Sequence, residues 1–357
     1  MSTLANTPLV SVLMSVYNGE PYLRQAIESI LDQSFADFEF IIVDDGSQDR
    51  TWDILREYAA RDARIVLIQN EANIGLTRSL NKGLAQARGK YIARQDADDV
   101  SLPERLELQV RYLEKSPQVG VLGSWIQFID EHGEAMGIRR LPVEPGLVKW
   151  SLLFGNYLVH TTVMFRRALV DQVGGYAPNT KYAQDYELWS RMYPRSKVVN
   201  LAQVLVHHRE HAKSIVANYP PTQKENLAKV SCALMAHVLG KEPSIELVIN
   251  LVHALHCQPL AEAQSVREVA RLIQALHYAY LEAEPLSDLE VKSVSRDAAN
   301  RLFTLGHWNL RRHPLASLAV LLQAIRMDIR VPLQRVLSRF WPFNRPVARP
   351  GTLVEDR

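Results

Sequence analysis

Three aspartates crowd one short segment, RQDADDVSLPERL (94–106), at Asp96, Asp98 and Asp99. An Asp-x-Asp pair that follows a buried strand suits Mg²⁺ or Mn²⁺, because these ions prefer oxygen ligands and can share them with a diphosphate. A solvated acidic turn is the alternative interpretation. On an extended strand Asp96 and Asp98 would share one face and Asp99 would point away. We therefore expect Asp96 and Asp98 to act as a pair and Asp99 to have a structural role.

Further polar residues lie where predicted strands end. Asp44 and Asp45 in the segment DDGS (44–47) could form a turn and helix cap, or Asp45 could accept hydrogen bonds from a nucleoside. Ser15 and Tyr17 follow the first strand, and the tyrosine ring could cover a base. Arg78, early in a predicted helix, is either a surface charge or a diphosphate clamp.

A second acidic group follows much later in the chain, in YAQDYELWSR (182–191). Asp185 and Glu187 could simply complement the dipole at the start of a helix. Alternatively, the fold could bring Asp185 opposite the Asp-x-Asp pair as a general base. The segment HHREH (207–211) then offers a histidine-rich turn, or a further metal or phosphate contact from Arg209 and His211. A zinc site is disfavoured, because no cysteine lies nearby.

The first hundred residues predict the elements that would position these side chains. Apolar runs that suit buried strands alternate with segments whose apolar residues recur at helical spacing. Such alternation predicts a mostly parallel sheet with helices on both faces and ligands beyond the carboxyl ends of the strands. The expected strands are 9–16, 38–47, 64–70 and 90–99, and the expected helices are 20–33, 47–61 and 77–88.

The rest of the chain divides into a mixed part and a helical part. Strand and helix signals mix from about 100 to 215, and only helical patterns follow Pro220-Pro221. We therefore expect a catalytic domain over 1–217 and a helical region over 218–357. From Arg301 onward the chain has ten arginines and three acids, with leucines and isoleucines from Leu315 to Ile329 near helical spacing. This region could contact an anionic membrane surface or pack on another protein surface.

Composition excludes several classes of protein. The chain has 357 residues, 47% of them hydrophobic, a formal net charge of +2 and two cysteines. These values suit a globular protein of about two domains and favour neither nucleic acid binding nor a disulfide framework. No secretory signal and no apolar run long enough to span a bilayer are visible. The sequence predicts a cytoplasmic protein, with any membrane contact peripheral.

Three segments together resemble the family 2 glycosyltransferases, which have the GT-A fold. They are VSVLMSVYNGEPYLRQAIESILDQSFADFEFIIVDDGSQDRT, NIGLTRSLNKGLAQARGKYIARQDADD and QDYELWSR, and the resemblance covers roughly residues 8 to 215. It implies an α/β GT-A domain that transfers a sugar from a nucleotide-diphosphate donor to an acceptor hydroxyl with inversion. UDP-sugars are the first choice of donor. The acceptor would be a glycan or a lipid-linked glycan in cell-surface polysaccharide or glycolipid assembly.

The resemblance also implies roles for individual residues. Asp185 would be the catalytic base, and Gln184 departs from the usual Glu-Asp pair at this point. The donor-binding residues would be Ser15, Tyr17, Asp45, Arg78, Asp96 and Arg209, and the ligands of Mn²⁺ or Mg²⁺ would be Asp98, Asp96 and His211. Two other classes stay open on the residues alone, a metal-dependent nucleotidyltransferase of sugar phosphates and a non-catalytic nucleotide-binding module.

Overall fold

The computed structural model describes residues 7–180, 182–211 and 221–331, without the side chains of 221–224. The chain forms two compact units, Met1–Leu234 and Met235–Arg357. The division falls within helix α8 (Pro221–Leu239). The boundary expected near residue 217 lies outside the described residues and stays a prediction.

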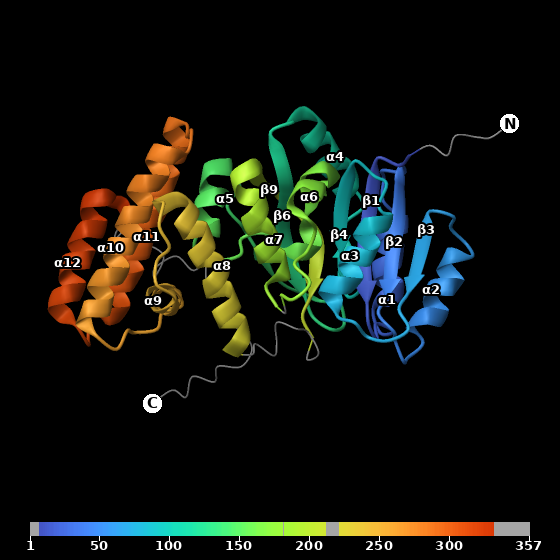
Figure 1. Cartoon of the computed structure of the whole chain (residues 1–357), viewed down its shortest axis with the longest axis horizontal. Coiled ribbons are helices and arrows are strands. Elements are labelled where there is room, and N and C mark those ends of the chain that lie inside the picture. Colours follow the sequence, from blue (N-terminus) through green and yellow to red (C-terminus); the bar gives the residue numbers. More distant parts are fainter. Residues whose placement is uncertain (1–6, 181, 212–220, 332–357) are drawn as a thin grey trace. The chain divides into compact units, whose positions relative to one another are not determined.

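The first four large strands form the parallel part of one sheet (Figure 1). Their order is β3-β2-β1-β4, and each neighbouring pair is parallel. The predicted alternation of strands and helices is confirmed in every element. The strands are β1 (Val10–Val16), β2 (Phe38–Asp44), β3 (Ile65–Gln69) and β4 (Tyr91–Gln95), and the helices are α1 (Leu23–Leu31), α2 (Thr51–Ala59) and α3 (Leu76–Gln86).

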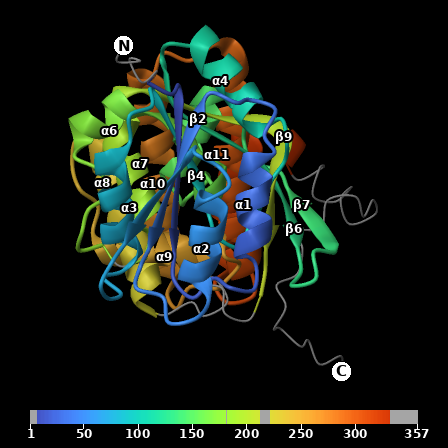
Figure 2. The same ribbon diagram turned by 90° about the vertical axis from the view of Figure 1, so that its right-hand side faces the viewer.

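Helices cover both faces of this sheet (Figure 2). On one face, α1, α2 and α4 (Arg105–Lys115) bury apolar side chains such as Ile27, Leu55 and Leu106 against the strands. On the other face lies α3, where Gly83 allows a close approach, because a Cβ there would lie 2.3 Å from Leu13. The apolar runs of β1 and β2 are thus buried on both sides, as expected of parallel strands, whereas the edge strand β3 is only partly buried.

The later strands extend the sheet and make it mixed. Strand β8 (Met164–Arg166) runs antiparallel to β4, and β6 (Val119–Ile129) pairs antiparallel with β8 and parallel with β9 (Lys197–Arg209). Two short strands, β5 (Val100–Ser101) and β7 (Ala135–Arg139), pair with β9 and β6. The remaining elements of this part are α5 (Pro145–Leu152), η1 (His160–Thr162), α6 (Arg167–Val173), α7 (Gln184–Met192) and η2 (Tyr193–Arg195).

The second unit is helical throughout its described part, which confirms the expected C-terminal helical region. It contains α9 (Ile245–Leu255), α10 (Ala263–Ala283), α11 (Asp288–Asn309) and α12 (Pro314–Met327). Leu251, Ile273 and Leu302 are fully buried in it. Within the described ranges, no helix combines the length and the apolar character needed to cross a membrane.

Candidate active site

The acidic segment begins where β4 ends at Gln95, and residues 97–98 form a turn. The expectation that Asp96 and Asp98 share one face of an extended strand is therefore wrong, because the strand stops before both residues. Asp96 accepts a hydrogen bond from Nη2 of Arg94 at 2.5 Å, and the arginine is fully buried. Burial alone would raise the pKa of Asp96, but the adjacent Arg94 charge lowers it. Asp96 is therefore held as a carboxylate.

Asp98 lies beside His211, which follows the end of β9. Its Oδ2 is 3.0 Å from Nε2 of His211. Burial, together with the charges of Asp99 and Asp96, raises the pKa of Asp98 to about 6. A cation beside this carboxyl would relieve that repulsion.

The donor atoms at this point are a carboxylate oxygen and an imidazole nitrogen, both of which Mn²⁺ accepts. Across the described residues, no cluster of three or more His, Cys, Asp or Glu side chains could enclose a metal ion. Asp98 and His211 therefore fit a cation only if oxygen atoms of a bound substrate complete its coordination. This arrangement is the one that an Asp-x-Asp motif and a diphosphate would make together.

Asp99 has the structural role that the sequence predicts. It is fully buried, its Oδ1 accepts a hydrogen bond from the backbone N–H of Arg209 at 2.8 Å, and its Oδ2 lies 3.1 Å from Nδ1 of His208. Burial alone would lower the pKa of His208, but the charge of Asp99 and this hydrogen bond raise it to about 9. Asp99 thereby ties the acidic turn to the end of β9.

The guanidinium of Arg209 hydrogen-bonds to groups within the protein. Its Nε donates to the carbonyl of Asp98 at 3.0 Å, and its Nη1 donates to the carbonyl of Asp130 at 3.0 Å. The guanidinium also lies over the ring of Tyr22, 4.6 Å from its centroid. Because Arg209 is only 2% exposed, these contacts support a role in shaping the turn. Donor binding by Arg209 stays a prediction.

A second buried arginine, Arg105, hydrogen-bonds to residues on both sides of the acidic turn. Arg105, at the start of α4, donates through Nη2 to the carbonyl of Arg94 at 2.6 Å and through Nη1 to Oγ of Ser101 at 2.7 Å. Nη1 also reaches Oε1 of Gln95 at 3.0 Å. Burial and the neighbouring Arg94 lower the pKa of Arg105 to about 9. The sequence reads as an ordinary helix start here, so residue pattern alone does not reveal this network.

Asp185 lies in the first turn of α7, after two residues with strained backbone. Tyr182 and Ala183 have φ values of 63° and 57°, which cost about 1–3 kcal/mol each for residues other than glycine. Oδ1 of Asp185 accepts a hydrogen bond from the N–H of Tyr186 at 2.8 Å, and Oδ2 accepts one from Nδ2 of Asn156 at 2.6 Å.

The environment of Asp185 suits a general base. Burial raises its pKa to about 6, against the lowering effect of the two hydrogen bonds, and the charge of Asp96 contributes in the raising direction. Both acidic groups border the short helix η1. The backbone N–H of Asp96 donates to Oγ1 of Thr161 at 3.3 Å, and the ring of His160 packs against Trp189 of α7, with 6.2 Å between the ring centroids. A carboxyl that ionises near pH 6 is an effective proton acceptor at neutral pH.

Sequence reasoning missed Asn156, because the segment FGN (154–156) carries only loop signals. The structure also shows the environment of His160, the first residue of η1. Its Nε2 lies 2.7 Å from the hydroxyl of Tyr176, and burial and the charge of Arg94 lower its pKa to about 3. A histidine held neutral in this way packs and orients its neighbours. It is not positioned as a charged acceptor contact.

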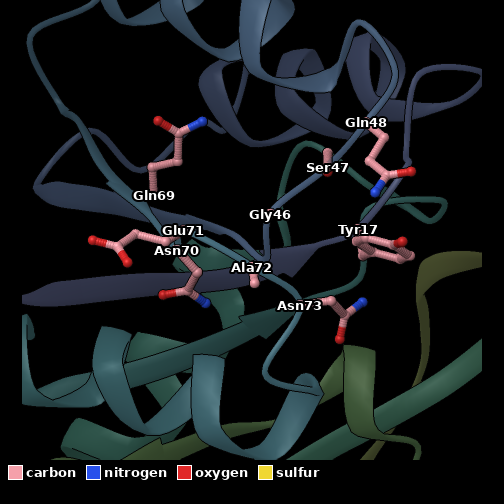
Figure 3. Close-up of a pocket in the computed structure, with 9 residues that line it drawn as sticks. All are labelled: Tyr17, Gly46, Ser47, Gln48, Gln69, Asn70, Glu71, Ala72 and Asn73. Atoms are coloured by element: carbon pink, nitrogen blue, oxygen red, sulfur yellow. The ribbon is translucent and has the colours of Figure 1, made fainter.

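A pocket of about 580 Å³ opens at the carboxyl ends of β1, β2 and β3 (Figure 3). Tyr17 stands at its mouth with 45% of its surface exposed. The other lining residues are Gly46, Ser47, Gln48, Gln69, Asn70, Glu71, Ala72 and Asn73. Polar side chains around one exposed aromatic ring provide the hydrogen-bonding groups and the stacking surface that a nucleoside requires.

Asp45 lies behind the wall of this pocket. Its Oδ1 accepts hydrogen bonds from Nδ2 of Asn70 and the N–H of Ile74, and its Oδ2 accepts one from the N–H of Gly75, all at 2.9 Å. The side chain is 2% exposed. Asp45 therefore fixes the 70–75 segment, and a direct contact with the nucleoside stays a prediction.

Ser15 and Arg78 lie outside the lining of this pocket, and their contact with the donor stays a prediction. Ser15 is buried in β1, and Arg78 is exposed in the first turn of α3. Neither lines the pocket. Ser47 does not cap α2, which begins at Thr51, because its Oγ instead accepts a hydrogen bond from the N–H of Asn18 at 3.0 Å. That bond joins the two loops that border the pocket.

Known sequences match this chain through the same region. The model of the glycosyl transferase family 2 matches residues 11–174. An uncharacterized glycosyltransferase of Haemophilus influenzae is 33% identical over 273 residues, which are 74% of this chain and 84% of that protein. The O-antigen biosynthesis glycosyltransferase WbnJ of Escherichia coli is 34% identical over 232 residues, 63% of this chain and 86% of that protein.

Solved structures with the same fold match almost the whole chain. TarS 1-349 of S. aureus, in complex with UDP-GlcNAc, has a TM-score of 0.53 at 18% identity and covers 91% of this chain and 92% of its own. The mannosyltransferase PcManGT of Pyrobaculum calidifontis, in complex with GDP-Man and Mn²⁺, has a TM-score of 0.52 at 17% identity, with 95% and 89% covered. These likenesses confirm the expected GT-A fold. On its sequence relatives, the chain belongs to glycosyltransferase family 2 and is a glycosyltransferase enzyme.

Proposed function

We propose that this enzyme transfers a glycosyl group from a nucleoside diphosphate sugar to an acceptor hydroxyl in a single inverting step. The main support is geometric: Asp96, next to the Asp98–His211 pair, and helix α7, which carries Asp185, both contact the short helix η1. Asp96 and Asp98 would serve the diphosphate of the donor, and Asp185 would serve the acceptor hydroxyl. A direct displacement requires this arrangement, because the nucleophile attacks from the face opposite the leaving group.

The pocket beside Tyr17 would hold the nucleoside of the donor. Its base would stack on the exposed tyrosine ring, and the polar side chains of 69–73 would meet the base and ribose edges. We propose a UDP-sugar as the donor. Asp45 would act by fixing the pocket wall. Ser15 and Arg78 do not line this pocket, so we propose that they contact a part of the donor outside it.

Asp98 and His211, with Asp96 nearby, would hold a divalent cation, Mn²⁺ or Mg²⁺. The chemistry that such a cation supplies when bound is neutralisation of charge on the departing diphosphate. Neighbouring residues set the charge and the position of these carboxyl groups. Arg94 keeps Asp96 ionised, and the contacts of Asp99 and Arg209 hold the turn that presents Asp98.

Asp185 would accept the proton of the acceptor hydroxyl as that oxygen attacks the anomeric carbon. Asn156 and the N–H of Tyr186 fix the direction of the carboxyl, so one lone pair stays aimed at the acceptor. The bond to the leaving diphosphate breaks as the new glycosidic bond forms, and the configuration inverts. No covalent intermediate with the enzyme is needed.

We further propose a glycan or lipid-linked glycan acceptor in cell-surface polysaccharide assembly. The support is the likeness to a relative named for O-antigen biosynthesis. The test is a panel of nucleotide sugars incubated with the enzyme and Mn²⁺, in which UDP release is measured and the product linkage is determined by NMR. Consumption of a UDP-sugar with inversion is expected. Retention of configuration, or reaction with none of the donors, would refute the proposal.

A further inference from the structure

Helix α12 has an unusual surface for the outermost helix of a helical unit (Figure 1). Helices at such positions normally carry polar residues on the side away from the core. Three leucines in α12 are instead strongly exposed, Leu315 by 82%, Leu318 by 53% and Leu322 by 47%. Their spacing of three and four residues places them on one face. Ile329, just beyond the helix, is 67% exposed.

The opposite face of α12 accounts for the packing of the unit. Ala316, Ser317, Val320 and Ala324 are buried. The contact with α11 is close, since a Cβ on Gly306 would lie 3.0 Å from the carbonyl oxygen of Ser317. The internal contact is made by these residues and Leu321, whose Cγ would lie 2.8 Å from a Cβ on Gly306, whereas Leu315, Leu318 and Leu322 lie outside it. The core of this unit does not require the exposed leucines.

Within residues 307–331, the exposed Asp, Glu, Lys and Arg side chains all carry positive charge. Arg311, Arg312, Arg326 and Arg330 are exposed. Between residues 307 and 331 the only acid is Asp328. It is buried and paired with Arg330 at 2.9 Å and Arg296 at 3.2 Å. Trp308 and Leu310, which precede the helix, add exposed apolar surface.

We infer that the outer face of α12, defined by Leu315, Leu318 and Leu322 with the arginines at 311, 312 and 326, docks on an anionic lipid surface. Leucines on one side of a helix can enter the boundary between headgroups and acyl chains, while flanking arginines bind the headgroup phosphates. The inference rests on α12 alone and does not depend on the donor or acceptor proposed above.

A second copy of the chain is a poorer occupant. A two-fold contact places the same patch on both partners, so the exposed arginines of one copy would face those of the other. The only acid of the segment is already neutralised inside the unit. Lipid phosphates provide the negative charge that this face lacks.

The test uses the full chain and co-sedimentation with vesicles of phosphatidylcholine, with and without phosphatidylserine. We expect binding only to the vesicles that contain phosphatidylserine, and weaker binding at high salt. The triple variant Leu315→Gln, Leu318→Gln, Leu322→Gln should lose binding. Its matched control is Leu289→Gln, which removes an equally exposed leucine from α11.

The electrostatic part is tested with Arg311→Gln, Arg312→Gln against the control pair Arg267→Gln, Arg271→Gln on α10. Since each arginine near an anionic surface contributes about a five-fold gain in binding, losing two should weaken it about 30-fold, and the control pair should not. Circular dichroism checks that all variants fold.

Three results would overturn the inference. The first is equal binding of the wild type to both vesicle types, or no binding to either. The second is unchanged vesicle binding by the folded triple variant. The third is a dimer, seen by light scattering, that the triple variant disperses while vesicle binding stays absent; that result would assign the face to a second copy.

Discussion

Asn156 donates a hydrogen bond from Nδ2 to Oδ2 of Asp185 at 2.6 Å, across 29 positions of sequence. The bond favours the ionised form of a carboxyl whose burial raises its pKa to about 6. Asn156 thus offsets part of the effect of burial and sets the pH at which the proposed base becomes available.

Replacing Asn156 with alanine should move the acid limb of the rate profile to higher pH. A hydrogen bond to a charged group contributes about 1.5–3 kcal/mol, and one pKa unit corresponds to about 1.4 kcal/mol. We expect the limb near pH 6 to rise by about one unit, with kcat reduced below it and the donor KM nearly unchanged. A profile that keeps its midpoint while the overall rate falls would show that Asn156 acts only on folding.

Asp185→Asn should fold and bind the donor yet lose transfer. General-base catalysis contributes about 10²–10⁴-fold to the rate, so we expect kcat to fall by that factor at every pH. Donor affinity, measured by calorimetry, should stay within a few-fold of the wild type, because the nucleoside pocket is formed by other residues. Near-normal turnover by this variant would remove Asp185 from the mechanism.

Asp98→Asn should separate metal binding from folding. Burial and two neighbouring carboxyls raise the pKa of Asp98 from 3.8 to about 6. A carboxyl with a raised pKa in the folded state costs stability as it ionises, so the stability of the metal-free wild type should fall as pH rises from about 4 to about 6. The variant should lack this contribution.

Thermal unfolding at several pH values, with and without Mn²⁺, measures both effects. Metal-free Asp98→Asn should gain Tm relative to the wild type as pH rises from about 4 to about 6, and the gain should stay constant at higher pH. Mn²⁺ together with UDP should raise the Tm of the wild type and leave the variant almost unchanged. The same Mn²⁺-dependent rise in both proteins would place the cation elsewhere.

Gly46→Ala should impair the nucleoside pocket more than glycine replacement in general does. Gly46 has φ of +74°, and a Cβ there would lie 2.6 Å from the backbone carbon of Ala72 in the pocket wall. Gly174 is the matched control, since its φ is +88° and a Cβ would meet nothing within 4 Å.

Both alanine variants carry the cost of left-handed backbone, about 1 kcal/mol. Only Gly46→Ala must also displace the wall, so we expect its UDP affinity to fall at least about ten-fold, as measured by calorimetry. Equal UDP affinities in the two variants would mean that the wall does not contact the nucleotide.

Local patterns were sufficient to predict the parallel half of the sheet. β1, β2 and β3 are apolar runs between amphipathic helices, and such patterns are a property of neighbouring residues in the chain. The mixed half is different, because β8 and β6 meet β4 and β9 through pairings between distant segments. No pattern within a single segment encodes such pairings, so they become visible only in the fold.

The same distinction applies to the site. Asp96, Asp98 and Asp185 could be proposed as site residues from the sequence, because each is a carboxylate at the end of a predicted strand or helix. The hydrogen bonds that determine their behaviour were not, because Arg105 and Asn156 look like ordinary helix and loop residues. Arg209 illustrates the limit. Its type suggested a diphosphate contact, whereas its position within the protein gives it carbonyl partners.

Each aspartate of the acidic turn has its own partner from the chain, namely Arg94 for Asp96, His211 for Asp98 and His208 for Asp99. Arg94 and His208 balance the charges of Asp96 and Asp99, and the hydrogen bond with His211 positions the side chain of Asp98. Folding of the newly made enzyme therefore need not await a metal ion, in contrast to proteins whose fold is assembled around one. A cation bound as proposed could therefore leave and return while the protein stays folded, and metal starvation would inactivate the enzyme reversibly.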